Sequence, residues 1–397
     1  MKVTKRNGRT EDFNEEKIKR CAERACDGVS TDVDPAAVVF NARIKLYDGV
    51  PTSEIDQALI RSARSLIEQE PMYRFVAAGL LRATIYKEVF GENADSDAFE
   101  LQYKKTFILN IKELIKSKIA SKELAKFDLK YLSSCLKIDR DRNFAYLGLQ
   151  TLYDRYLMHI DDKKMETPQG FWMRVAMGLA IKEAPEDKEK YAARFYNLLS
   201  NFEFMSSTPT LFNSGGTFNQ LSSCYLNTFE DSINGIFDGV HQEALKNKYA
   251  GGLGMDITSF RATNSYITGT NGSTQGAVYF WKLYGDMLAA VNQGGKRRGA
   301  GCAYLECWHA DFDDFLALRK NTGDERKRTH DMNTASWIPD LFMKRIQEDG
   351  EWHLFSPDET PELHELFGAE FVKKYEEYTK LGKKGKSYIP NQPSQRH

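Results

Sequence analysis

The feature that most constrains the fold is a change in sequence texture near residue 206. Residues 92–205 carry charged faces and few helix breakers, which is typical of a mainly helical segment. From residue 206 onward, short apolar runs are separated by Gly, Asn, Ser and Thr, which indicates strands alternating with helices. The 397 residues therefore predict two or three domains, with a helical part before an α/β part.

The first 90 residues or so have a third pattern. Asn7-Gly8 lies between two short polar-apolar segments and predicts a β-hairpin over residues 2–13 with a type I′ turn. Capping residues, a Pro at a helix start and a Gly stop at Gly28 then predict four helices. These helices are expected to begin at Asn14, at Asp34-Pro35, at Thr52 or Ser53, and near Phe75.

Composition excludes several function classes. Lys+Arg 55 against Asp+Glu 56 gives a net charge of −1, so there is no polyelectrolyte argument for nucleic acid or membrane binding. No apolar run approaches the roughly 20 residues that span a bilayer, and the N-terminus lacks the apolar segment of a secretory signal. The six cysteines form no Cys-x-x-Cys motif, so we expect no zinc, no other metal in this chain, and a reducing cytosol.

Chemistry is concentrated around one cysteine and two glycine-rich stretches. Cys224 ends the sequence Ser222-Ser223-Cys224, and a thiol there can give up hydrogen and close a disulfide with a facing thiol. A buried and inert strand cysteine is the alternative. The glycine-rich stretches are 250–256 and 293–301, and glycine allows a ligand to approach the backbone closely.

Taken together, Ser207-Thr208-Pro209, the Ser-Ser-Cys segment and both glycine-rich stretches resemble the large, catalytic subunit of ribonucleotide reductase, closest to class I. The resemblance implies an α+β and α/β multidomain chain. Residues 1–91 would form an ATP-cone, a hairpin with helices that binds regulatory nucleotides. Residues 92–205 would form a helical domain, and residues 206–397 the first half of a ten-stranded α/β barrel.

The resemblance also implies three groups of site residues. Cys224 would be one half of the redox pair that reduces the substrate at the 2′ position, while Cys302 and Cys307 would be structural. The substrate pocket would use Thr208, Ser223, Cys224 and Gly252, since hydroxyl groups, N–H donors and a small residue suit a diphosphate and a ribose. The ATP or dATP activity site would use Lys5, Glu11, Lys17, Thr52 and Lys87, with the lysines facing phosphate.

A specificity site for deoxynucleoside triphosphate effectors is the third group. Its anchors match Asp231, Ser232, Arg261 and Thr268, where a carboxylate can hold a ribose and a guanidinium can bind phosphate. Some relatives have a second arginine where this chain has Thr268. Residues Gln293 and Arg297 match the loop that links effector to substrate, a two-state element that allosteric coupling requires.

The resemblance finally implies partners. The Asn-x-Cys-x-Glu stretch that carries the radical cysteine of the family does not occur before His397. We therefore expect a split large subunit, as in some phages, with a complementary fragment that carries that stretch. A small subunit with the radical-generating metal, thioredoxin or glutaredoxin, and further copies of the chain would complete a cytoplasmic enzyme. A non-catalytic nucleotide-binding regulator and a reductase with a B12 or glycyl radical are the alternatives.

Overall fold

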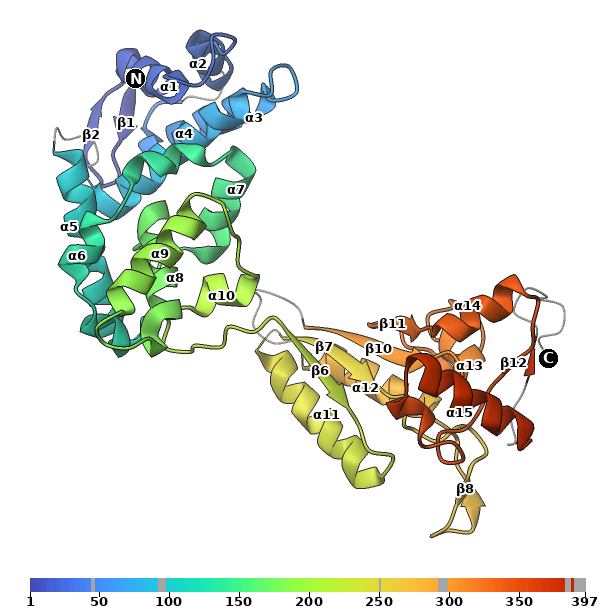
Figure 1. Cartoon of the computed structure of the whole chain (residues 1–397). Coiled ribbons are helices and arrows are strands. Elements are labelled where there is room, and N and C mark those ends of the chain that lie inside the picture. The colour runs from blue at the N-terminus through green and yellow to red at the C-terminus, as the bar shows by residue number, and fades with distance from the viewer. Residues whose placement is uncertain (44–46, 92–97, 250, 292–298, 383–386, 389–397) are drawn as a thin grey trace. The chain divides into compact units, whose positions relative to one another are not determined.

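The computed structural model describes residues 1–43, 47–91, 98–249, 251–291, 299–382 and 387–388. The chain divides into two compact units, Met1–Leu221 and Ser222–His397 (Figure 1), and each has its own hydrophobic core. The described part contains no helix long and apolar enough to cross a membrane.

The first unit begins with a small sheet and four long helices. Its strands occur in the order β2-β1-β3. The elements of this region are β1 (Lys2–Thr4), β2 (Thr10–Asp12), α1 (Glu15–Cys26), α2 (Pro35–Arg43), β3 (Val50–Pro51), α3 (Thr52–Ser65) and α4 (Tyr73–Phe90).

The Asn7-Gly8 prediction is right about the hairpin and wrong about the turn. β1 pairs antiparallel with β2. A type I′ turn needs positive φ at both central residues, but of the two only Gly8 has it, with φ 82°. Gly8 N donates to Lys5 O (2.9 Å) and Lys5 N to Arg9 O (2.8 Å), which gives a longer loop with a glycine in the left-handed region. The sequence also did not predict β3, which pairs parallel with β1.

Local signals explain the first helices. Asn14 caps α1 by accepting a hydrogen bond from Glu16 N (2.9 Å), and the chain turns away at Gly28, whose φ is 70°, as predicted. α4 is buried on most sides, with Val76, Ala77 and Ile85 wholly inaccessible. A helix that is apolar nearly all round belongs in a core, and α4 packs against α1, α3, α5 and α7.

The rest of the first unit is mainly helical, as the sequence predicts. Its elements are α5 (Phe99–Lys116), η2 (Lys122–Lys126), α6 (Leu129–Ser134), η3 (Ile138–Asn143), α7 (Tyr146–Thr151), the π-helical turn η4 (Leu152–Tyr156), β4 (His159–Ile160), β5 (Lys163–Lys164), α8 (Pro168–Leu179), η5 (Ala180–Lys182), α9 (Lys188–Ser200) and α10 (Thr208–Asn213). Residues 206–221 pack within this unit, where Ser121 N donates to Gly215 O (2.9 Å).

A buried carboxylate joins α4 to the helical part. Asp141 is 1% exposed and accepts hydrogen bonds from Tyr86 Oη (2.6 Å), Tyr103 Oη (2.9 Å) and Gln169 Nε2 (2.8 Å). Burial raises the pKa of Asp141 to about 6. These donors come from three helices, so the buried acid fixes how the helices of this unit meet.

The second unit alternates strands and helices. Its elements are β6 (Cys224–Thr228), α11 (Ile233–Lys248), β7 (Gly252–Asp256), β8 (Tyr266–Ile267), β9 (Gly272–Ser273), α12 (Val278–Ala290), β10 (Ala300–Glu306), α13 (Phe312–Leu316), η6 (Glu325–Lys327), β11 (Met332–Trp337), α14 (Asp340–Gln347), β12 (Trp352–His353), η7 (Leu363–Glu365), α15 (Gly368–Lys380) and β13 (Ser387–Tyr388).

Four parallel strands form the main sheet, in the order β11-β10-β7-β6 (Figure 1). Each strand pairs with the next parallel strand along the chain, which is the succession that builds α/β barrels, and the described strands do not close. On one face Leu253, Met255, Leu305 and Met332 are buried in the same core as side chains of α11 and α12.

The other face of the sheet carries the thiol. Because side chains alternate along a strand, the register places Cys224, Gly252 and Ala300 in one row across β6, β7 and β10. Large apolar side chains on this face are accessible, with Leu226 80% and Trp337 64% exposed. We call this surface the open face.

Candidate nucleotide and thiol sites

The first unit contains a pocket of about 760 Å³, which we call the cone pocket. Its volume is within the usual range for a small-molecule site. Seven of the lining side chains are basic and two are acidic, so the pocket suits a polyanion. All five residues predicted for the activity site line it: Lys5, Glu11, Lys17, Thr52 and Lys87.

Two carboxylates organise the cations of the cone pocket. Glu11 Oε1 lies 3.3 Å from Lys5 Nζ and 2.9 Å from Lys17 Nζ, and hydrogen bonds from Lys17 and then Lys5 lower the pKa of Glu11. Asp56 lies 2.9 Å from Lys87 Nζ through Oδ1. Partly exposed pairs contribute little stability, but they hold long side chains at the wall of the pocket.

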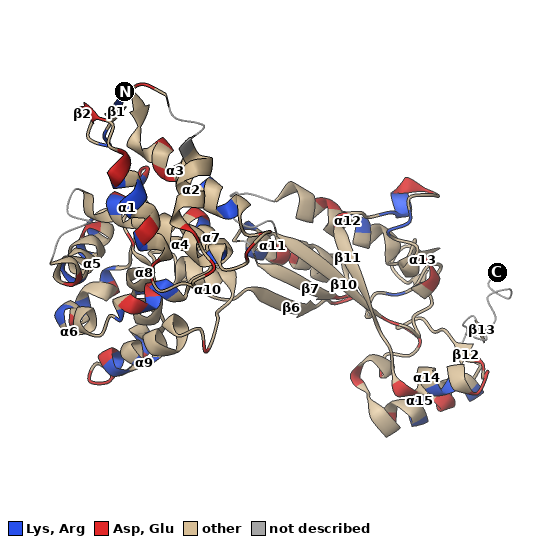
Figure 2. Ribbon diagram, turned by 90° about the horizontal axis from the view of Figure 1, so that it is seen from above, with Lys and Arg blue, Asp and Glu red and all other residues tan. Residues whose placement is uncertain are grey.

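Sequence reasoning missed Asp56 and Arg6. Arg6 Nη1 lies 2.9 Å from Asp56 Oδ2, and both residues line the cone pocket. The spacing from Thr52 could have indicated Asp56, since residues four apart share a helix face. Over the described chain, positive and negative side chains are interspersed (Figure 2), so the basic lining is a local feature.

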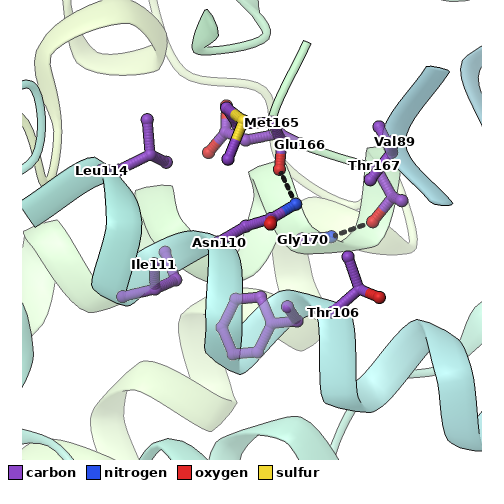
Figure 3. A pocket seen from close by; sticks show the side chains of 10 residues that line it. Val89, Thr106, Asn110, Ile111, Leu114, Met165, Glu166, Thr167 and Gly170 are labelled. Carbon is purple, nitrogen blue, oxygen red and sulfur yellow. Dashed lines mark hydrogen bonds between the residues drawn. The ribbon is translucent and has the colours of Figure 1, made fainter. Parts of the chain in front are cut away.

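A second cavity in this unit is too small for a ligand. It lies beside α5 and has a volume of about 10 Å³, which is room for one water at most. Asn110 Nδ2 donates to Met165 O (2.7 Å) and Gly170 N to Thr167 Oγ1 (3.3 Å) at its wall (Figure 3). The cavity is therefore a packing gap.

Thr208 begins α10, also in the first unit, and is partly buried. Its Oγ1 lies 3.1 Å from Tyr156 Oη. The side chain of Arg174 is inaccessible and forms an ion pair with Glu166 (Nε–Oε1 2.8 Å). Arg174 Nη1 also donates to Ser214 O (2.8 Å). The guanidinium therefore satisfies a carbonyl just beyond the end of this short helix.

Ser223, Cys224 and Gly252 lie together in the second unit. Cys224 is the first residue of β6, is exposed, and is a free thiol. Ser223 Oγ lies 3.6 Å from Cys224 Sγ. The N–H of Gly252 donates to Ser223 O (2.7 Å), so this donor is not available to a ligand. Gly252 can contribute only by letting a ligand approach the backbone closely.

Near Cys224 on the open face, the side chain of Leu226 packs over Gly254. A Cβ at Gly254 would lie 2.4 Å from Leu226 Cδ2, a distance at which atoms clash. Cys302 and Tyr304 follow on β10 and face the same side. Burial raises the pKa of the Cys302 thiol; the thiols of Cys302 and, less strongly, Cys224 contribute to raising the pKa of Tyr304. The phenol therefore lies near both sulfurs.

The predicted specificity anchors are also brought together. Arg261 Nε lies 2.6 Å from Asp231 Oδ2, and Arg261 Nη1 donates to Tyr266 O (3.2 Å). Ser232 caps α11, because its Oγ accepts from Gly235 N (3.0 Å). The exposed Thr268 lies in the turn between β8 and β9, directly after the last residue of β8.

The two remaining predicted residues, Gln293 and Arg297, lie outside the described residues.

A charged histidine that the sequence did not reveal lies at the carboxyl ends of β7 and β10. His364 Nε2 is 3.1 Å from Asp256 Oδ2, and Nδ1 is 2.6 Å from Glu306 Oε1. These hydrogen bonds raise the pKa of His364 to about 10. Burial acts to raise the pKa of Asp256, but hydrogen bonds from His364 and Thr258 outweigh it and lower that pKa. We call these three side chains the His364 clamp.

Comparisons with known proteins match almost the whole chain. Three domain models fit in succession: the ATP cone domain at residues 1–88, the ribonucleotide reductase all-alpha domain at 142–219, and the ribonucleotide reductase barrel domain at 222–392. In the described part, no group of three His, Cys, Asp or Glu side chains is arranged to hold a metal ion.

Whole-chain relatives agree with the domain models. The chain is 47% identical over 378 residues to the ribonucleoside-diphosphate reductase subunit alpha of Chlamydia muridarum, covering 95% of this chain and 36% of that protein. It is 42% identical over 389 residues to the subunit of the same name in Helicobacter pylori J99, covering 98% and 48%. The large subunit of monkeypox virus is 39% identical over 387 residues, covering 95% and 48%.

The chain spans between a third and a half of the length of these relatives. The predictions of an ATP-cone, a helical domain and the start of an α/β barrel are confirmed. Since three successive domain models and relatives across nearly its full length agree, the chain belongs to the family of ribonucleotide reductase large subunits.

Proposed function

We propose that this chain is the regulatory and substrate-binding part of a class I ribonucleoside-diphosphate reductase, which makes deoxyribonucleotides for DNA synthesis. The observation that carries the proposal is the placement of Cys224. Its free thiol is exposed at the start of a parallel strand, beside Ser223 and Gly252. Gly252, the residue opposite Cys224 on the neighbouring strand, has no side chain, so a nucleotide could approach the backbone closely there.

The thiol supplies reducing equivalents. Cys224 and a second thiol together release two electrons and two protons and form a disulfide. One proton leaves with the 2′-hydroxyl of the ribose as water, and the other proton and the two electrons form the new C–H bond at C2′. Cys302 is not that second thiol. β7 separates it from β6, so about two strand spacings, near 10 Å, part the Cα atoms, whereas a disulfide needs less than about 7 Å.

The second redox cysteine and the radical cysteine would therefore come from the remaining barrel, on this polypeptide or on a complementary fragment that carries Asn-x-Cys-x-Glu. A small subunit with a metal centre would start the radical reaction. Thioredoxin or glutaredoxin would reduce the disulfide again in the cytosol. Among the described residues the six cysteines form no disulfide, which suits a reducing compartment.

Regulation would use two nucleotide sites. The cone pocket would bind ATP or dATP, with Lys5, Lys17 and Lys87 on the phosphates and Thr52 at the start of α3, where helix N–H groups favour anions. Deoxynucleoside triphosphate effectors would bind near Asp231, Ser232, Arg261 and Thr268 at an interface between copies of the chain, with Gln293 and Arg297 in the linking loop. Because Asp231 and Arg261 pair with each other, an effector would replace that ion pair.

Reduction of CDP tests the proposal. The assay contains ATP, a dithiol reductant and a class I small subunit, with the chain alone and then with a polypeptide that carries the remaining barrel. We expect multiple turnovers in the mixture, loss of turnover with Cys224→Ser, and retention with the matched control Cys302→Ser. An active mixture that tolerates Cys224→Ser would contradict the role of this thiol. Nucleotide binding without any turnover would favour the non-catalytic regulator.

A further inference from the structure

We propose that Tyr156 is a positioning residue for the substrate: its phenol fixes the Thr208 hydroxyl for binding the diphosphate of a ribonucleoside diphosphate. This inference rests on the proposed function and on the prediction from the sequence that Thr208 contacts the substrate. The two oxygens, Tyr156 Oη and Thr208 Oγ1, lie 3.1 Å apart, a normal distance for a hydrogen bond between hydroxyl groups.

The chemistry of the two groups sets the direction of this hydrogen bond when substrate is bound. Each hydroxyl has one proton to donate, whereas the oxygens of a diphosphate only accept. If Tyr156 donates to Thr208, the proton of Thr208 is left for a phosphate oxygen. Without the phenol, the Thr208 hydroxyl is free to rotate, and part of the binding energy is lost in ordering it.

The ring of Tyr156 packs against α10, the helix that carries Thr208. It stacks against Phe212 with centroids 4.5 Å apart and planes at 23°. Thr208 and Phe212 are four residues apart in α10, so they lie on one face of the helix. Tyr156 thus contacts that face through its ring and through its hydroxyl, which fixes the phenol relative to Thr208.

The backbone at Tyr156 is held as well. Leu157 N donates to Leu152 O (3.2 Å), which closes the π-helical turn η4, and such turns are frequent at functional sites. Arg174 donates to Tyr156 O (Nη2, 3.5 Å) and to Leu211 O in α10 (Nη1, 3.1 Å). One buried guanidinium therefore links the backbone of η4 to that of α10.

A double-mutant cycle on the assembled complex tests the inference. Equilibrium binding of CDP is measured for the wild type, Tyr156→Phe, Thr208→Val and the double variant. We expect Tyr156→Phe to weaken binding about three- to tenfold, the effect of one hydrogen bond, and to add nothing when Thr208 is already Val. With Thr208→Ser, which keeps the hydroxyl, Tyr156→Phe should again weaken binding.

The matched control is Tyr153→Phe, in the same turn, whose hydroxyl donates to Glu88 (2.9 Å); we expect CDP affinity to stay unchanged. In turnover, Tyr156→Phe should raise KM and leave kcat within about twofold. Equal losses in the Thr208 and Thr208→Val backgrounds would overturn the inference, as would a wild type that binds no CDP. Coupled binding without turnover would uphold it while the proposed reductase activity fails. Thermal unfolding of each variant confirms that the fold is retained.

Discussion

The His364 clamp should make the second unit less stable as the pH rises above neutrality. Its imidazolium has a folded pKa of about 10, against an ordinary value of 6.5. A raised pKa means that the stabilisation is fully present below about 6.5 and is lost as the pH rises through about 10. The perturbation is therefore a pH series on the wild type and on His364→Gln.

The magnitude follows from the pKa and the exposure. Each pKa unit corresponds to about 1.4 kcal/mol, so the rise sets a ceiling of about 5 kcal/mol. The His364 side chain is 20% exposed, and desolvation of Asp256 and Glu306 offsets part of the gain. We therefore expect the folded protein to lose about 2 kcal/mol of stabilisation from the clamp as the pH rises from 6.5 to 9.5.

Urea unfolding, followed by tryptophan fluorescence, measures this contribution. Four of the five tryptophans lie in the second unit, Trp172 being the exception. The free energy of unfolding should fall by about 2 kcal/mol more in the wild type than in His364→Gln. His330→Gln is the matched control, because His330 is paired with Glu325 on the exposed surface at 3.7 Å. Parallel pH curves for the wild type and His364→Gln would refute the reasoning.

Two further predictions concern the first unit. Lys87→Ala should weaken ATP binding to the cone pocket about tenfold or more, because a charged hydrogen bond to phosphate is lost; calorimetric titration at low salt, with the exposed Lys116→Ala as control, measures it. Arg174→Leu should destabilise the unit by about 3–5 kcal/mol, since it leaves the Glu166 charge buried without a partner. In thermal unfolding, adding Glu166→Leu should recover much of that loss, and an Arg174 variant as stable as the wild type would contradict the argument.

Features with local causes could be predicted from the sequence. The cap at Asn14, the stop at Gly28 and the hairpin around Gly8 depend on a few adjacent residues, and the structure has all three. The strand β3 was missed because two residues, Val50–Pro51, carry no periodic signal, and their partners Val3 and Thr4 in β1 lie far earlier in the chain.

Features that depend on distant pairs could not be predicted in the same way. The sequence places Lys5 and Lys87 at a phosphate site only through resemblance, and nothing in it shows that Asp56 would pair with Lys87. His364 lies 58 residues from Glu306 along the chain, and no spacing rule connects them. The roles of the individual site residues remain predictions that the experiments above address.

The open face carries both exposed apolar side chains and the Cys224 thiol. Leu226 and Trp337 are 80% and 64% exposed on it, and apolar surface of this kind gains stability when covered. Cys224 lies on the same face, so a barrel segment that covered these side chains would also remove water from the thiol. Radical chemistry needs an enclosed site that prevents side reactions. In the proposed enzyme, burial of the apolar face and enclosure of Cys224 are thus one event, and replacing Leu226 by a polar residue should weaken association with the remaining barrel and turnover together.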